Sequence, residues 1–76
     1  MIDEAEGFLF SLGFKQVRVR HYQNLARIEI YPEEMGRFMA SSTREEVVSR
    51  LKEIGYKYIT LDLQGFRSGS MNEVLR

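Results

Sequence analysis

Apolar residues recur every three or four positions at the start of the chain, at Ala5, Phe8, Leu9 and Leu12. This spacing is typical of one face of a helix, and Gly13 follows where helices often end. The pattern predicts a helix over about residues 4–12. Asp3 and Glu6 have the spacing of a capping box, so we expect them to cap the start of this helix.

Two alternating stretches follow and predict a β-hairpin. Apolar residues occupy every second position in both, namely Val17 and Val19, then Ala26, Ile28 and Ile30. A two-residue turn at Gln23 and Asn24 would pair Val19 with Ile28, Arg20 with Arg27, and Arg18 with Glu29. Such a turn needs positive φ, which Asn24 tolerates and Gln23 tolerates less well.

The rest of the chain predicts further helices and a third strand. Pro32 begins a short helix with an apolar face of Met35, Phe38 and Met39. The next helix has Thr43 and Glu46 as its capping box, Gly55 at its end, and an apolar face of Val47, Val48, Leu51 and Ile54. The third strand has alternating apolar residues at Ile59, Leu61 and Leu63. Ser70 and Glu73 have capping-box spacing for a last short helix.

These elements predict an α+β fold. Their order is α-β-β-α-α-β with a short C-terminal helix, and each strand has one apolar face. Helices should therefore cover one face of a three-stranded mixed sheet and leave the other bare, in a two-layer α/β sandwich. We expect residues 1–76 to form a single small domain. Its bare face should carry Arg18, Arg20, Tyr22, Arg27, Glu29, Tyr58, Thr60 and Asp62.

Composition excludes several classes of protein. The 76 residues include no Cys, which rules out a disulfide scaffold, a thiolate metal site and a Cys nucleophile. No apolar run approaches the roughly 18 residues that cross a membrane, and the acidic start is unlike a signal peptide, so we expect a cytoplasmic protein with no membrane partner. The 11 basic and 11 acidic residues cancel, which argues against a nucleic-acid partner.

The charges are nevertheless segregated along the chain. No acidic residue lies between Glu6 and Glu29, a stretch that contains Lys15, Arg18, Arg20, His21 and Arg27. Arg20 opposite Arg27 would be destabilising unless a negative group lies between them. Guanidiniums bind phosphate or carboxylate through two donors at once, so we predict a local anion site on the bare face. A solvated charged face is the alternative.

The tail contains a second candidate for anion binding. Arg67, Ser68, Gly69 and Ser70 lead into the last predicted helix, where free N–H groups attract anions. The spacing is not that of a Walker A loop, and an ordinary capped helix start would also explain it.

Catalytic and metal-binding residues are not evident in the sequence. His21 has no second His and no Cys with which to form a metal cluster or a Cys-His pair. Glu6, Glu46 and Glu73 are explained as helix caps. Asp62 is expected to pair with an arginine.

Three blocks of the sequence resemble a known family. They are Val17-Arg18-Val19-Arg20-His21, Ala26-Arg27-Ile28-Glu29, and Asp62-Leu63-Gln64-Gly65-Phe66-Arg67-Ser68-Gly69-Ser70-Met71-Asn72-Glu73. Together they are similar to the C-terminal domain of the LarE-like ATP-dependent sacrificial sulfur transferases, which are relatives of the PP-loop ATP pyrophosphatases. The likeness extends from Ala5 to Leu75.

This resemblance implies a part of a larger enzyme of nickel-pincer cofactor synthesis. Family members join this domain to an ATP-binding PP-loop domain, which uses ATP and Mg and adenylylates a carboxylate of a pyridinium mononucleotide. The phosphate loop and the sulfur-bearing Cys are both missing from this sequence, so the chain would hold no cofactor and would not be catalytic alone. It would act with a PP-loop domain in cis or in trans, as a stand-alone or split protein or as a domain of a longer chain.

The resemblance also implies a set of site residues. Arg18, Arg20 and Arg67 would form a phosphate or substrate-anion site at subunit contacts, which implies a homo-oligomer. Glu6 matches an acidic position near that site. The other residues that we expect to contribute are Ser68 and Ser70 in the tail, and Arg27, Glu29 and Asp62 as supports that orient the arginines. The expected function is therefore substrate-anion binding and assembly.

Two other functions fit the same elements. One type of KH domain has the order α-β-β-α-α-β and binds RNA with a G-x-x-G loop between its paired helices, but residues 40–43 here read Ala-Ser-Ser-Thr. A purely structural homo-oligomerisation domain is the second alternative, because a chain this short buries little surface by itself.

Overall fold

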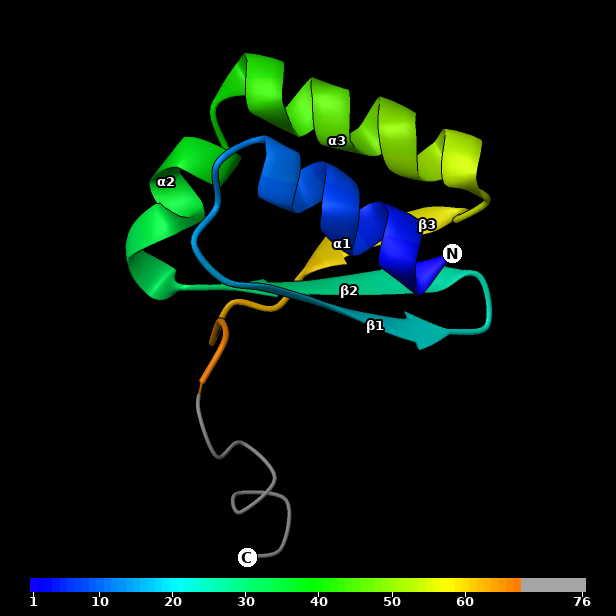
Figure 1. Ribbon diagram of the computed structural model, residues 1–76, viewed down its shortest axis with the longest axis horizontal. Coiled ribbons are helices and arrows are strands. Elements are labelled where there is room, and N and C mark those ends of the chain that lie inside the picture. Colours follow the sequence, from blue (N-terminus) through cyan, green and yellow to red (C-terminus); the bar gives the residue numbers. More distant parts are fainter. Residues whose placement is uncertain (68–76) are drawn as a thin grey trace, which may run out of the picture.

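A computed structural model describes residues 1–67 of the chain (Figure 1). Its elements are α1 (Ile2–Ser11), β1 (Val17–Tyr22), β2 (Leu25–Ile30), the 3₁₀ turn η1 (Pro32–Glu34), α2 (Met35–Phe38), α3 (Ser41–Ile54) and β3 (Tyr58–Leu61). The predicted α+β order is thereby confirmed. The short helix predicted at Ser70 and Glu73 lies outside the described residues.

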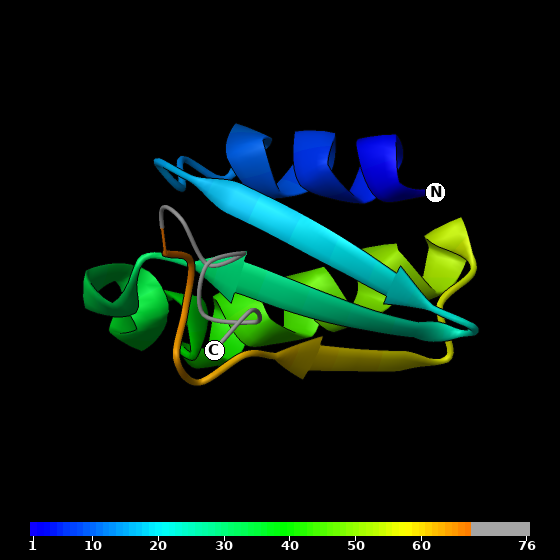
Figure 2. The same cartoon turned by 90° about the horizontal axis from the view of Figure 1, so that it is seen from below.

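The three strands form one mixed sheet in the order β1-β2-β3 (Figure 2). β1 pairs antiparallel with β2, and β2 pairs parallel with β3. The hairpin register is the predicted one, with Arg18 opposite Glu29, Val19 opposite Ile28, and Arg20 opposite Arg27.

The two residues of the hairpin turn differ in backbone conformation. Gln23, the residue less suited to it, takes a positive φ of 53°. The Asn24 carbonyl accepts the backbone N–H groups of Lys57 and Tyr58 at 2.8 and 3.2 Å, which ties the turn to the start of β3. The parallel strand therefore constrains Asn24, and the left-handed conformation occurs at Gln23 instead.

Helices α1 and α3 cover one face of the sheet, and among residues 1–67 no helix covers the other (Figures 1 and 2). Alternate strand residues point into the helix layer, as the apolar pattern predicted. The buried core consists of Ala5, Leu9, Phe14, Val17, Val19, Ala26, Ile28, Ile30, Phe38, Val47, Leu51 and Tyr56. The polar residues of the strands, apart from His21, are consequently left on the bare face.

The starts of α1 and α3 differ from the prediction. α1 begins at Ile2 and α3 at Ser41, earlier than their capping boxes imply, and neither helix has a side-chain cap. The predicted capping roles of Glu6 and Glu46 are therefore wrong, because both residues lie within helices that have already begun.

The apolar residues at two element ends are more exposed than predicted. The Asp62 carboxylate accepts a hydrogen bond from the Gln64 N–H at 2.9 Å and turns the chain after β3. Leu63, predicted as a strand residue, is consequently 83% exposed. Met39 was predicted in the core, but it follows the last residue of α2 and is exposed.

Candidate anion site

The bare face carries its side chains in rows, because paired residues of neighbouring strands project on the same side of a sheet. From the hairpin turn onward, the rows are Tyr22-Leu25-Tyr58, Arg20-Arg27-Thr60 and Arg18-Glu29. Asp62 comes directly after the end of β3. The fold therefore brings five of the predicted site residues onto one face, with arginines at its centre.

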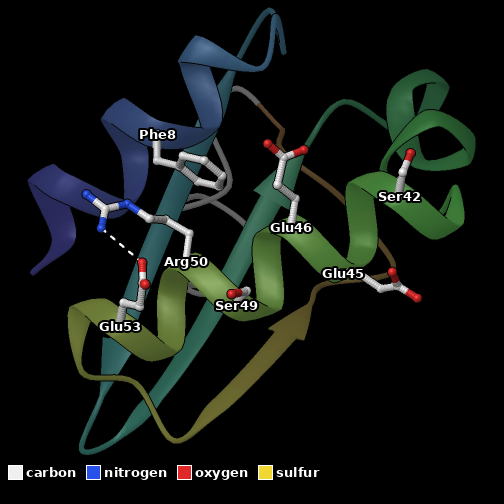
Figure 3. A pocket seen from close by; sticks show the side chains of 7 residues that line it. All are labelled: Phe8, Ser42, Glu45, Glu46, Ser49, Arg50 and Glu53. Carbon is white, nitrogen blue, oxygen red and sulfur yellow. Dashed lines mark hydrogen bonds and ion pairs between the residues drawn. The ribbon is translucent and has the colours of Figure 1, made fainter.

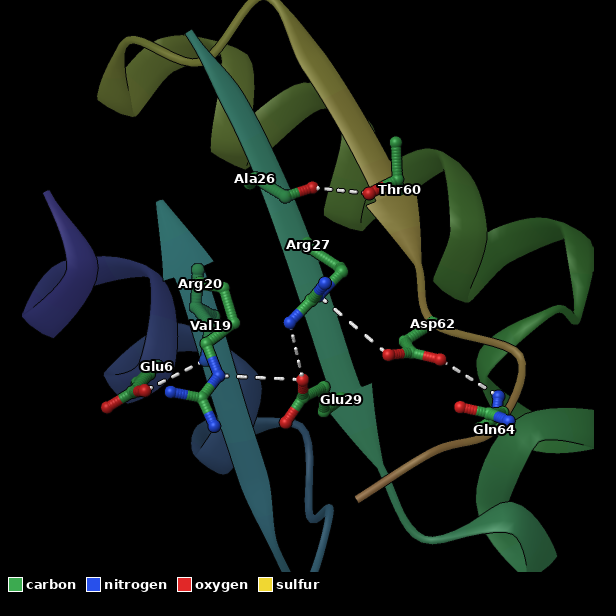
Figure 4. A network of polar contacts seen from close by, with 9 residues as sticks. All are labelled: Glu6, Val19, Arg20, Ala26, Arg27, Glu29, Thr60, Asp62 and Gln64. Atoms are coloured by element: carbon green, nitrogen blue, oxygen red, sulfur yellow. Dashed lines mark hydrogen bonds and ion pairs between the residues drawn. The ribbon is translucent and has the colours of Figure 1, made fainter. Parts of the chain in front are cut away.

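Glu29 lies between two of these arginines (Figure 4). Its Oε2 accepts a hydrogen bond from Arg27 Nη2 at 3.2 Å and lies 3.5 Å from Arg20 Nε. The residue is only 7% exposed, and a buried carboxylate is tolerated when cations pair with it. The negative group that the facing arginines require is thus supplied in part by the protein itself.

Asp62 holds the other side of Arg27. Its Oδ2 lies 3.8 Å from Arg27 Nε, so two carboxylates fix this guanidinium. Thr60, in the same row as Arg27, donates its hydroxyl hydrogen bond to the Ala26 carbonyl at 2.8 Å. The centre of the face is therefore held in a defined geometry.

Arg18 and Arg67 lie at the end of the sheet away from the hairpin turn. Arg18 Cζ lies 6.0 Å from the centroid of the Phe66 ring, within the range of a cation–π contact. The Phe66 N–H donates to the Ile30 carbonyl at 2.7 Å, which fastens this segment to β2. Arg67 follows directly and is half-buried, whereas the predicted site residues Ser68 and Ser70 lie outside the described residues.

Gly65 makes that fastening possible. Its φ is +80°, and a Cβ at this position would lie 2.7 Å from the Ile30 carbonyl oxygen. A side chain would therefore push the segment away from β2, so the glycine of the third sequence block determines where Phe66 and Arg67 lie.

Glu6 binds the free edge of β1. Its Oε2 accepts a hydrogen bond from the Val19 N–H at 2.9 Å. A shallow depression of about 630 Å³ lies beside this contact, lined by Ile2, Glu6, Arg18, Val19, Arg20 and His21. The structure thus brings Glu6 together with Arg18 and Arg20 at one edge of the sheet.

His21 and Tyr56 form a contact that the sequence did not reveal. His21 Nδ1 shares a hydrogen bond with the Tyr56 hydroxyl at 3.1 Å, and the rings meet edge to face. Burial, and secondarily the Glu6 carboxylate, raises the pKa of Tyr56 above its ordinary 10.0. The residues are 35 positions apart in the chain, and no local pattern links them.

The helix layer has a different character from the bare face. A groove between α1 and α3 is lined by Phe8, Arg50 and two serines, together with Glu45, Glu46 and Glu53 (Figure 3). None of the predicted site residues that the structure describes lies in it. Only Met39 and Ala40 separate α2 from α3, so the connection offers no loop like that of a KH domain.

Metal and membrane features are also absent from residues 1–67. No group of three His, Asp or Glu side chains in this range could hold a metal ion. None of the helices described is long and apolar enough to cross a membrane.

The arrangement suits binding of an oxyanion. A guanidinium has five N–H donors. Among the described residues, Glu29 and Asp62 contact one nitrogen of Arg20 and two of Arg27. Arg18, Arg20 and Arg27 outnumber the two carboxylates that residues 1–67 place on this face. The face therefore keeps a positive excess and has donors for a phosphate or carboxylate.

Comparison with known proteins identifies relatives along nearly the whole chain. It is 46% identical over 97% of its length to an uncharacterized protein of Synechocystis, and 34% identical over 88% to an uncharacterized protein of Methanocaldococcus jannaschii. It is 48% identical over 93% of its length to the pyridinium-3,5-bisthiocarboxylic acid mononucleotide synthase of Lactiplantibacillus plantarum.

The coverage of these relatives is much smaller. The chain spans 25–28% of their lengths. No family model matches the chain. The resemblance derived from the three sequence blocks is confirmed at this level, since the chain is homologous to a region of LarE, the pyridinium-3,5-bisthiocarboxylic acid mononucleotide synthase.

Proposed function

We propose that this chain is the substrate-anion-binding and assembly part of a sulfur transferase of nickel-pincer cofactor synthesis, and that it is not catalytic alone. The observation that carries the proposal is the homology to a synthase whose product is, by its name, a mononucleotide. A mononucleotide bears a phosphate, and the bare face of this chain carries arginines with a positive excess of charge. The two findings support the same ligand chemistry.

The proposed ligands of the phosphate or carboxylate are Arg18, Arg20 and Arg67, with Ser68 and Ser70 contributing hydroxyls. Among the described residues, Glu29 contacts Arg20 through Nε, and the two terminal nitrogens of Arg20 are the donors that we assign to the ligand (Figure 4). Arg18 is exposed and packs near Phe66, next to Arg67 in the chain. An anion at this end of the sheet would meet donors held in place before it arrives, which reduces the entropy lost on binding.

The supporting residues act through the arginines. Arg27, Glu29 and Asp62 form a chain of charged contacts of 3.2–3.8 Å beneath the proposed ligand. Glu6 lines the depression next to Arg18 and Arg20. In this proposal Glu6 limits how many anions the edge accepts, because a second negative ligand there would meet its carboxylate.

The partner in this proposal is an ATP-binding PP-loop domain, supplied in cis or in trans, which would bring ATP and Mg. The bare face, with its exposed tyrosines, is the surface available for that domain or for another copy of the chain. Multi-angle light scattering of the chain, alone and mixed with a PP-loop domain, tests this part. A monomer that forms no complex at any concentration would contradict it.

Titration with inorganic phosphate followed by amide NMR tests the anion site. We expect the largest shifts around residues 18–20 and 67–70. Arg20→Gln and Arg18→Gln should each weaken phosphate binding about tenfold, since a charge-assisted hydrogen bond is lost. Arg44→Gln is the matched control, because it removes the same charge from α3 on the other layer. The anion-site proposal would be overturned if neither segment shifted. It would also be overturned if Arg44→Gln lost as much phosphate affinity as the other two variants.

A further inference from the structure

A second depression on the bare face lies at the hairpin end of the sheet. It has a volume of about 360 Å³ and is lined by Arg20, His21, Tyr22, Leu25 and Arg27. Small-molecule sites begin at about 300 Å³, so this space can hold one ring with a small substituent. Of these residues, the anion site proposed above uses Arg20 as a ligand and Arg27 as a support.

The apolar wall of this depression is aromatic. Tyr22 is 73% exposed, although burying an aromatic ring would be favourable. It pairs with Leu25 across the hairpin, and both side chains project on the bare face. Leu25 is half-buried and forms an apolar surface beside the Tyr22 ring. Together they offer a flat hydrophobic surface on which a planar ring can stack.

The opposite wall is cationic. Arg20 and Arg27 face each other across β1 and β2, one row from Tyr22 and Leu25. Both are anchored to the same oxygen of Glu29, so their guanidiniums are oriented by the protein and not only by a ligand. Neighbouring rows on one face of a strand are about 6.6 Å apart, two residues of strand rise. This is close to the distance between an aromatic ring and an anionic group attached to it through a short linker.

His21 also lines the depression, but its imidazole lies on the helix side of β1. It alternates with Arg20 and Tyr22 along the strand, and its Nδ1 contacts the Tyr56 hydroxyl at 3.1 Å. The imidazole is therefore not part of the proposed subsite.

From this juxtaposition we propose that the depression binds the aromatic ring of a nucleotide-like ligand, stacked on Tyr22 and Leu25, while Arg20, supported by Glu29 and Arg27, holds the anionic group next to the ring. The inference rests on the proposed function, because it places the ring of the ligand whose anion the arginines bind. It adds a ring subsite and a determinant of specificity, Tyr22, to a site otherwise defined by charge.

Matched ligands and variants of the 76-residue chain test the ring subsite. The probes are inorganic phosphate, ribose 5-phosphate, AMP and nicotinamide mononucleotide, measured by calorimetry. At least one of the two ring-bearing probes should bind about tenfold more tightly than ribose 5-phosphate, which is the size expected for stacking on one aromatic side chain. Tyr22→Val should abolish that tenfold difference and leave the affinity for ribose 5-phosphate unchanged.

Tyr58→Val is the matched control. Tyr58 lies in the same row and is 56% exposed, yet it is not among the residues that line the depression. This variant should keep the preference for the ring, and thermal unfolding of both variants verifies that they fold. If phosphate binds but neither ring adds affinity, or if both variants lose the same amount, the ring subsite is wrong and the anion site stands. If none of the probes binds, both proposals fail.

Discussion

Replacement of Glu29 by Gln is the most informative single change. It keeps the size of the side chain but removes the negative charge that both Arg20 Nε and Arg27 Nη2 approach, at 3.5 and 3.2 Å. Arg20 and Arg27 then remain opposite each other across the hairpin without their shared counterion. Like charges in that position are destabilising.

The expected magnitude follows from the burial of the three groups. Breaking a fully buried ion pair costs about 3–5 kcal/mol. Here the Glu29 side chain is 9% exposed, but the arginine side chains are 42% and 50% exposed, so water screens much of the repulsion. We therefore expect Glu29→Gln to lower the free energy of unfolding by about 1–2 kcal/mol.

Phosphate should partly reverse this loss. An anion that binds only the folded chain stabilises the folded state. Phosphate should bind the Glu29→Gln variant more tightly than wild type, because the competing carboxylate is gone. The assay is urea unfolding followed by circular dichroism, in phosphate and in chloride of equal ionic strength. Glu53→Gln is the control, because Glu53 pairs with Arg50 on the surface and should change stability by less than about 0.5 kcal/mol. Equal stability of Glu29→Gln and wild type, or no greater gain from phosphate in the variant, would refute the reasoning.

Three further substitutions test local features of the fold. Gly65→Ala should cost more than about 2 kcal/mol, because the new Cβ would lie 2.7 Å from the Ile30 oxygen at a φ of +80°; urea unfolding measures the loss, and a change below 0.5 kcal/mol would contradict the close approach. Gln23→Gly should raise the unfolding free energy by up to about 1 kcal/mol, since glycine adopts the 53° φ without strain; a lower melting temperature would count against this account of the turn. The raised pKa of Tyr56 means that the folded chain keeps a proton which the unfolded chain releases near pH 10, so stability is retained below pH 10 and falls above it. Tyr56→Phe should make the decline above pH 10 shallower in unfolding measured against pH, and an unchanged slope would show that Tyr56 does not cause it.

The hairpin and the bare face could be predicted because their signals are local. Alternation of apolar and charged residues determines which side of a strand faces the helices, and a turn of fixed length determines the pairing. Once Arg18, Arg20 and Arg27 were assigned to one face, the need for a negative group between the facing arginines followed. Glu29 lies opposite Arg18 as predicted, and the structure shows that its carboxylate reaches Arg20 and Arg27.

The contacts between distant segments could not be predicted from the sequence. The Asp3–Glu6 spacing matched a capping box, but α1 begins at Ile2, so Glu6 lies inside the helix and reaches Val19. The pairing of His21 with Tyr56 depends on how α3 returns the chain to β3. Such side chains carry no periodic signal, because tertiary packing alone decides what they meet.

The hydrogen bond from Val19 to Glu6 also bears on how this small sheet avoids aggregation. An outer strand presents donors to which a strand from another molecule can pair. The Glu6 carboxylate of α1 already accepts the Val19 N–H of β1. A strand of a second chain would have to displace this carboxylate in order to pair with that edge. The same contact keeps the border beside Arg18 and Arg20 accessible to small solutes, where an added strand would otherwise cover it.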